Sequence, residues 1–169
     1  MFTHMYPTSK RPSSGVFVQQ QVESLRREGI EVDVLHIDVI GSKWRYFWSF
    51  VPFLNWVMRH KYDLVHAHYV FAGIVARSQF WIPVVLTHHG DETFYSWTAL
   101  LCRIISCLAN KTIVVTEQMR KSLRLPSVTI IPCGVDLELF KPMPQHEARQ
   151  HLGLPLDKKL VLFTGDLIP

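Results

Sequence analysis

Histidines and carboxylates follow one apolar run of the chain, where they could bind or polarise a ligand. The run at 83–88 is continued by His89, Gly90, Asp91 and Glu92. A histidine at the end of a strand can donate a hydrogen bond to a hydroxyl or to a charge that develops during a reaction, and carboxylates can accept from hydroxyls. Loops after buried strands often carry function, so we interpret this segment as a ligand site; a solvated loop is the alternative.

A second pair of histidines, His66 and His68, follows another apolar segment. Their spacing of two places both imidazoles on one face of a strand. Together with His88 and His89 they could form a zinc site, but closed zinc sites usually have more closely spaced ligand pairs. We favour orientation of a substrate, or capping of the next helix.

One glycine, Gly15, stands where the first helix would open. A glycine there lets the backbone approach a phosphate, and the amide groups of a helix N-terminus favour an anion. The segment matches neither G-x-G-x-x-G nor a P-loop, so a plain turn is the alternative.

The segment 43–61 is aromatic and apolar, with basic residues at both ends. Trp44, Phe47 and Trp48 begin a row of apolar side chains at helical spacing, and Pro52 predicts a kink. Such a helix suits a bilayer surface or a lipid-linked ligand. A helix packed against the sheet is the alternative.

The elements that must position these groups alternate between strands and helices. Alternation predicts a strand at 31–37, and runs rich in β-branched residues predict buried parallel strands at 63–67, 83–88, 111–116, 127–131 and 159–165. Residues 1–2 are too few for a first strand. Helices are expected before Gly29 and over 69–80, 96–109 and 117–123. The alternation predicts an α/β fold, namely a Rossmann-like, doubly wound, mostly parallel sheet with helices on both faces.

Length and composition limit the class of protein. The 169 residues suffice for one domain with a sizeable core, and 48% hydrophobic and 19% charged residues exclude a disordered chain. The net charge of +4 fits anionic partners such as diphosphates, nucleic acid or acidic lipids without selecting among them. The odd number of cysteines and the lack of a signal peptide or a run of about 20 apolar residues favour a cytoplasmic protein.

Taken in order, these segments resemble the N-terminal domain of the family 4 (group 1) glycosyltransferases, which have the GT-B fold. THMYP and GVFVQQQVESLRREGIEVDVL are similar to the family's glycine loop, first helix and second strand. DLVHAHYVFAGIVA, VVLTHHGDE and NKTIVVTEQMRKSL resemble its later strands and helices, VVLTHHGDE matching a His-Gly-x-Asp/Glu strand end. The most specific element is VTIIPCGVDLELFKP, which closely resembles the linker signature, and the resemblance covers nearly the whole chain.

The resemblance implies a hexosyltransferase that is retaining and metal-independent and needs no cofactor beside its UDP- or GDP-sugar donor. It implies that this domain binds a glycan or lipid-linked acceptor, that it binds no nucleic acid, and that a second Rossmann-like domain binds the donor. His89 is then the catalytic residue and contacts the donor sugar. Further nucleotide-sugar contacts are expected from Ser14, Gly15, Gly90, Glu92, Thr116 and Glu117.

The same resemblance divides the chain. Residues 1–141 are expected to form the acceptor-side domain, 142–158 an interdomain linker, and 159–169 the first strand of a C-terminal donor domain that is cut short, leaving the chain inactive alone. Cys133 stands where the linker usually has Asn, and Asp166 where the next strand often ends in Gly-Arg. Peripheral membrane contact is expected through Trp44, Phe47 and Trp48.

Two other functions stay open at this point. The chain could be a non-catalytic sugar- or lipid-binding α/β module, or a metal-dependent hydrolase built on the histidines.

Overall fold

The computed structural model describes residues 1–39, 43–94 and 96–163. The chain divides into two units, Met1–Gly134 and Val135–Pro169. The first unit contains the sheet and the histidine segments, and the second contains the short helix α7 (Gln145–His151).

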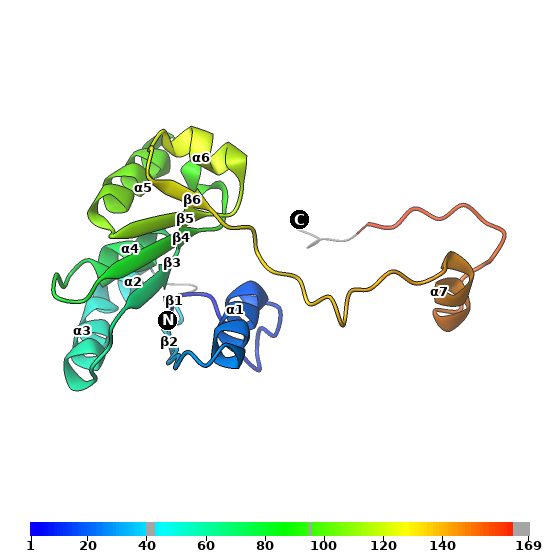
Figure 1. The fold of residues 1–169 in the computed structure, drawn as a ribbon, viewed down its shortest axis with the longest axis horizontal. Helices are drawn as coiled ribbons and strands as arrows, with labels where there is room; N and C mark the ends of the chain where they lie inside the picture. Colours follow the sequence, from blue (N-terminus) through cyan, green and yellow to red (C-terminus); the bar gives the residue numbers. More distant parts are fainter. Residues whose placement is uncertain (40–42, 95, 164–169) are drawn as a thin grey trace. The chain divides into compact units, whose positions relative to one another are not determined.

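Six parallel strands form one sheet in the order β2-β1-β3-β4-β5-β6 (Figure 1). Their bounds are β1 Phe2–Thr3, β2 Leu35–His36, β3 Val65–His68, β4 Val84–His88, β5 Lys111–Val114 and β6 Val128–Ile130. Because the strands are parallel, their carboxyl ends meet at one edge, where ligands bind in doubly wound sheets. The predicted Rossmann-like α/β fold is confirmed.

The expectation that residues 1–2 are too few for a first strand is wrong. Phe2 and Thr3 pair with β2 on one side, and Phe2 pairs with Ala67 of β3 on the other. The short strand holds this interior position because both neighbours bond to it and the Phe2 side chain is fully buried.

Two other predicted strands differ from the structure. Only Leu35–His36 of the segment 31–37 pairs as a strand. Residues 159–163 form no strand, since no described strand pairs with them, and 164–169, with Asp166, lie outside the described residues. The division of the chain at residues 141 and 158 stays a prediction.

Helices cover both faces of the sheet (Figure 1). On one face, α1 (Val16–Arg27) packs through Val18 and Val22 beside Met1. The other face carries a layer made of α3 (Phe50–Arg59), α4 (Val70–Ala76), α5 (Ser96–Leu108) and α6 (Glu117–Leu123). The 3-10 turn η1 (Asp91–Thr93) joins β4 to α5.

The aromatic segment 43–61 forms two helices, so the predicted kink at Pro52 is wrong. The break between α2 (Lys43–Trp48) and α3 falls at Ser49, whose hydroxyl donates to the carbonyl of Tyr46 at 2.6 Å. Pro52 lies in the first turn of α3, where an amide hydrogen would have no partner within the helix.

The two helices differ in burial. In α3, Phe53 and Val57 are buried against the sheet, whereas in α2 Trp44 is 74%, Phe47 63% and Trp48 63% exposed. The segment therefore combines both expectations: α3 belongs to the core, and the rings of α2 lie at the surface. None of the described helices is long and apolar enough to cross a bilayer.

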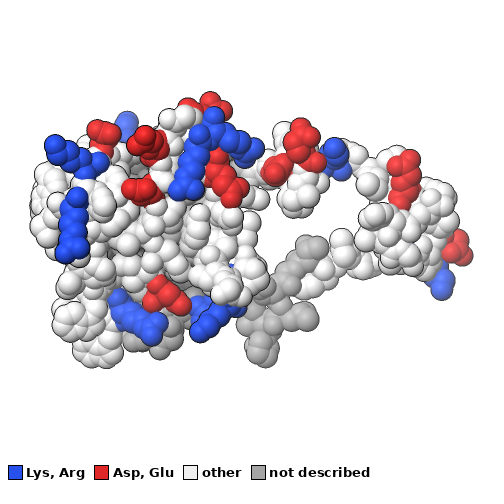
Figure 2. Space-filling view, turned by 90° about the horizontal axis from the view of Figure 1, so that it is seen from below, with Lys and Arg blue, Asp and Glu red and all other residues white. Residues whose placement is uncertain are grey.

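Basic and acidic side chains are interspersed on the face of the molecule seen in Figure 2. No broad field of one sign is visible on that face.

Phe53 and Phe47 form a matched pair that tests which part of the segment is core. The ring of Phe53 lies 4.9 Å from that of Phe2, measured between centroids. We expect Phe53→Ala to lower the free energy of unfolding by about 3–5 kcal/mol, because it leaves a cavity. Phe47→Ala should change it by less than about 0.5 kcal/mol. Urea unfolding followed by circular dichroism measures both; similar losses for the two variants would contradict the assignment.

Candidate functional site

Three histidines, His66 and His68 of β3 and His89 just after β4, form a column near the carboxyl edge of the sheet. The rings of His66 and His68 lie 4.5 Å apart with 23° between their planes, and those of His68 and His89 lie 5.1 Å apart with 21°. His66 and His68 share one face of β3, as their spacing predicts. The pairing of β3 with β4 places His68 opposite Thr87, which brings His89 alongside.

A hydrogen bond joins two members of this histidine column, and the third bonds to a threonine. Nδ1 of His68 lies 2.8 Å from Nε2 of His89, and Nε2 of His68 lies 2.7 Å from the Met1 sulfur. At the other end, Nε2 of His66 lies 2.7 Å from the Thr87 hydroxyl. Burial lowers the pKa of His66 and of His89 to about 4, and that of His68 well below its usual value. The column is therefore neutral near pH 7.

Two distant segments converge on His89. The ring of Phe17, in the first turn of α1, lies 4.4 Å from the His89 ring. The Cys133 sulfur lies 3.6 Å from His89 Nδ1. Sequence reasoning identified Cys133 only as a departure from the linker pattern and missed Phe17. Neither residue is near His89 in sequence, so no local signal marks the contact.

Gly15 has a structural reason for being glycine. It precedes α1 with φ of +67°, and an added Cβ would lie 2.4 Å from the Met5 carbonyl oxygen. The close approach of the chain's own backbone explains the residue without a ligand. Ser14, half-buried, donates its backbone N–H to the Arg11 carbonyl at 3.2 Å. Phosphate contact at Ser14 and Gly15 stays a prediction.

Glu92 and His88 face away from the histidine column. Nε2 of His88 lies 3.0 Å from the Ser106 hydroxyl of α5, and its Nδ1 lies 3.5 Å from Oε1 of Glu92. The suggested grouping of His88 with the other three histidines is therefore not formed. Glu92 is 8% exposed, and its carboxylate oxygens have no hydrogen-bond partner among the described residues.

Gly90 is closely packed between its neighbours. An added Cβ would lie 2.4 Å from the Tyr69 hydroxyl oxygen and 2.8 Å from Oε2 of Glu92. Tyr69 itself has φ of +78°, which a residue with a side chain rarely adopts. Sequence reasoning missed Tyr69. The turn around Gly90 is thus fixed by packing, and ligand contacts of Gly90 and Glu92 stay predictions.

Thr116 and Glu117 begin α6 at the same edge of the sheet. The Thr116 hydroxyl accepts from the Met119 N–H at 3.2 Å and so caps the helix. Glu117 is exposed and accepts from Nε of Arg120 at 2.9 Å, a hydrogen bond that lowers the pKa of Glu117. Both side chains have structural partners in the chain, and their contact with a nucleotide sugar stays a prediction.

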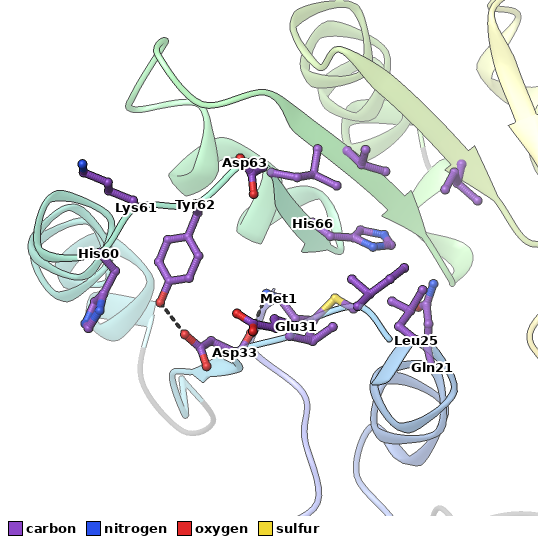
Figure 3. Close-up of a pocket in the computed structure, with 15 residues that line it drawn as sticks. Met1, Gln21, Leu25, Glu31, Asp33, His60, Lys61, Tyr62, Asp63 and His66 are labelled. Carbon is purple, nitrogen blue, oxygen red and sulfur yellow. Dashed lines mark hydrogen bonds between the residues drawn. The ribbon is translucent and has the colours of Figure 1, made fainter. Parts of the chain in front are cut away.

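A cavity of about 550 Å³ lies on the α1 face of the sheet (Figure 3). His66 lines one side of it, and Asp33 accepts a hydrogen bond of 2.8 Å from the Tyr62 hydroxyl on another. The histidine column therefore extends from this cavity to the loop that carries His89. In the part of the chain that the structure describes, no three histidine, cysteine or acidic side chains are grouped to hold a metal ion.

The family model and the curated relatives that match this chain are glycosyltransferases. The model of glycosyltransferase family 4 matches residues 14–139, more than half of the chain. TuaC of Bacillus subtilis (strain 168), named for teichuronic acid biosynthesis, is 25% identical over an alignment that covers 98% of this chain and 57% of TuaC. A D-inositol 3-phosphate glycosyltransferase of Nocardiopsis dassonvillei is 33% identical over 62% of this chain and 29% of its own length.

The fold recurs among solved structures. Sucrose-phosphate synthase from Thermosynechococcus elongatus superimposes with a TM-score of 0.67 at 21% identity, covering 84% of this chain and 47% of that protein. At this identity the likeness concerns the fold alone.

His4, which follows β1, is a buried histidine outside the column and tests the cost of such burial. Its ring contacts those of Phe2 and Tyr46 at 5.2 and 5.0 Å, and neither ring nitrogen has a partner among the described residues. Burial lowers its pKa from 6.5 to about 4. Between these values the unfolded state binds more protons, so stability should fall as the pH is lowered from about 6.5 to 4.

We expect His4→Phe to keep the ring contacts and remove this titration. The variant should then gain stability over the wild type at pH 5 relative to pH 8, as measured by urea unfolding at both values. His151→Phe, at an exposed position of α7, is the matched control and should leave the pH dependence unchanged. Parallel stability curves for His4→Phe and the wild type would contradict the prediction.

Proposed function

The chain belongs to glycosyltransferase family 4, and we propose that it forms the acceptor-side domain of an enzyme that transfers a sugar from a nucleotide sugar to a glycan or lipid-linked acceptor. One observation carries this proposal: His89, in the His-Gly segment after β4, meets the first turn of α1 at the carboxyl edge of a parallel sheet. A neutral imidazole at this edge suits contact with hydroxyl groups.

The names of two relatives support a proposal for the chemical class of the acceptor. One is named for teichuronic acid biosynthesis and another acts on D-inositol 3-phosphate. On this basis we propose an acceptor rich in hydroxyl groups, carried by a glycan or a lipid. We further propose a UDP- or GDP-sugar donor and retaining, metal-independent transfer, which rest on family membership.

A transfer assay on the full-length gene product tests the proposal. Labelled UDP- and GDP-sugars are incubated with glycan and lipid-linked acceptors, and both the released nucleoside diphosphate and the labelled product are measured. We expect one donor to give labelled product. Binding of a sugar or lipid without turnover of any donor would favour the non-catalytic module instead.

His89→Ala tests the role of the histidine. If His89 bonds a substrate hydroxyl, its loss should cost about 1–3 kcal/mol of transition-state stabilisation, which is a drop in kcat/KM of roughly 5- to 160-fold. His60→Ala, at an exposed position outside the column, is the control and should change kcat/KM little. An unchanged kcat/KM together with a large fall in Tm would show that His89 is structural.

A membrane surface is the second partner that we propose, on the cytoplasmic side. The exposed rings of Trp44, Phe47 and Trp48 lie in a stretch without acidic residues from Val39 to Tyr62. That stretch also contains the exposed Arg45, Arg59 and Lys61. Aromatic rings with basic neighbours suit the interface of an anionic bilayer.

The triple variant Trp44→Ser, Phe47→Ser and Trp48→Ser tests this contact by co-sedimentation with phosphatidylglycerol-containing vesicles. We expect binding to be lost while circular dichroism stays unchanged, because the rings are exposed. Wild-type binding should weaken as salt rises, since charges are screened within about 10 Å at 0.1 M ionic strength. Salt-independent binding, or full binding by the triple variant, would contradict the proposal.

A further inference from the structure

The outer side of α5 is apolar. In the described part of this helix, residues 97–108, every exposed side chain is apolar. The one charged residue of α5, Arg103, is half-buried and donates to the Ser122 carbonyl at 2.8 Å. Spacings of three and four residues form one stripe from four side chains that are 50–66% exposed, namely Trp97, Leu100, Ile104 and Leu108. A surface helix normally presents polar side chains to water, so this stripe indicates a partner.

The turn between α4 and β4 extends the apolar stripe. Phe80 and Trp81 are both exposed in this turn. The Val84 N–H, which follows them, accepts no other partner than the Asn110 side-chain oxygen at 2.9 Å, and Asn110 comes just after α5. The turn therefore lies beside the C-terminal end of α5. We call the four stripe residues together with Phe80 and Trp81 the α5 surface.

The helices beside α5 continue this outer side of the molecule. α3, α4 and α5 lie side by side on one face of the sheet, and α2 contacts α3 (Figure 1). In α3, Val51 and Met58 are exposed. The helix layer thus exposes apolar side chains from α2, which carries the exposed rings described above, to α5.

Charge selects the partner of the α5 surface. α2, α3, α4 and α5 contain no acidic residue. Arg45 of α2 and Arg59 of α3 are exposed, and the Arg77 guanidinium lies 4.9 Å from the centre of the Phe80 ring. A second copy packed on this layer would bring like charges together without acidic partners from these helices. An anionic bilayer instead attracts the basic side chains and takes up the apolar ones.

We propose that the α5 surface is a second membrane anchor, which lays the helix layer from α2 to α5 flat on an anionic bilayer. The proposal extends the membrane contact proposed above for α2, and either contact can exist without the other. α5 runs from the turn η1, near the loop that carries His89, to the opposite edge of the sheet. Anchoring along its length therefore brings both edges of the sheet to the membrane and leaves the α1 face, with its cavity, toward water.

Two exposed cysteines test the proposal in the wild-type chain. Cys107 lies seven residues after Leu100 and so shares the stripe, whereas Cys133 lies beside His89, which contacts α1 on the other face. Both thiols are alkylated with a water-soluble maleimide, with and without vesicles of phosphatidylglycerol and phosphatidylcholine, and mass spectrometry follows each product. We expect the vesicles to slow alkylation of Cys107 in proportion to the bound fraction of the protein and to leave Cys133 unchanged. An unchanged rate at Cys107 on vesicle-bound protein would overturn the proposal.

Two double variants separate the α5 surface from other exposed apolar residues. Leu100→Ser with Ile104→Ser changes α5. Ile30→Ser with Leu64→Ser is the matched control, because both residues are exposed and line the cavity on the α1 face. In co-sedimentation with the same vesicles, the α5 variant should bind about tenfold more weakly and the control like the wild type. Equal binding by the two variants would contradict the proposal. If circular dichroism shows that the α5 variant is unfolded, the cysteine measurement on the wild type decides.

The outcomes distinguish this proposal from the contact proposed for α2. Loss of vesicle binding by the triple variant of α2, with full binding by the α5 variant and a reactive Cys107, would leave the α2 contact standing and overturn this one. Without lipid, alkylation of Cys107 that slows as the protein concentration rises would show that a second copy covers α5, and would also overturn the proposal. Sugar transfer is measured separately by the donor assay, so its failure leaves the vesicle result intact.

Discussion

Alternation of side chains across the strands of one parallel sheet is the constraint on which the rest of the structure depends. In β3, Val65 and Ala67 belong to the core under the helix layer, whereas His66 and His68 stand on the α1 face. Met1 likewise packs on the α1 face, whereas Phe2 belongs to the core under the helix layer. The sheet therefore separates an apolar face from a face that carries polar groups, and a slip of one residue in register would exchange them.

Burial makes the two faces of the sheet chemically different. The layer of α3, α4, α5 and α6 closes the apolar face, and β1 is held inside the sheet by Phe2, which contacts Phe53 of that layer. On the opposite face α1 leaves the cavity that His66 lines. Histidines placed there lose water, and for His89 this burial outweighs the attraction of the Glu92 carboxylate, so the pKa values fall and the rings stay neutral near pH 7.

The carboxyl edge combines rigid and exposed parts. Packing of Gly15 against Met5 and of Gly90 against Tyr69 fixes the two turns beside His89. Near the same edge, Tyr46 of α2 contacts His4 after β1, and the aromatic rings that flank Tyr46 are exposed. An acceptor anchored in a bilayer would thus be presented close to the edge that carries His89, which links the two proposals through one part of the fold.

The sequence by itself determined the class of fold and the location of the candidate site. Runs of β-branched residues and helical periodicity are local properties, and they predicted β3 to β6, α5 and α6 and the pairing of His66 with His68 on one face. The two-residue strand β1 was missed because its neighbouring strands stabilise it. The break at Ser49 was missed because the hydrogen bond from Ser49 to the Tyr46 carbonyl does not alter the apolar periodicity. Only the tertiary structure decided that His89 meets His68, Phe17 and Cys133 while His88 turns toward Ser106. Those contacts join residues far apart in the chain, and they depend on strand register and helix packing, which no short window of sequence contains.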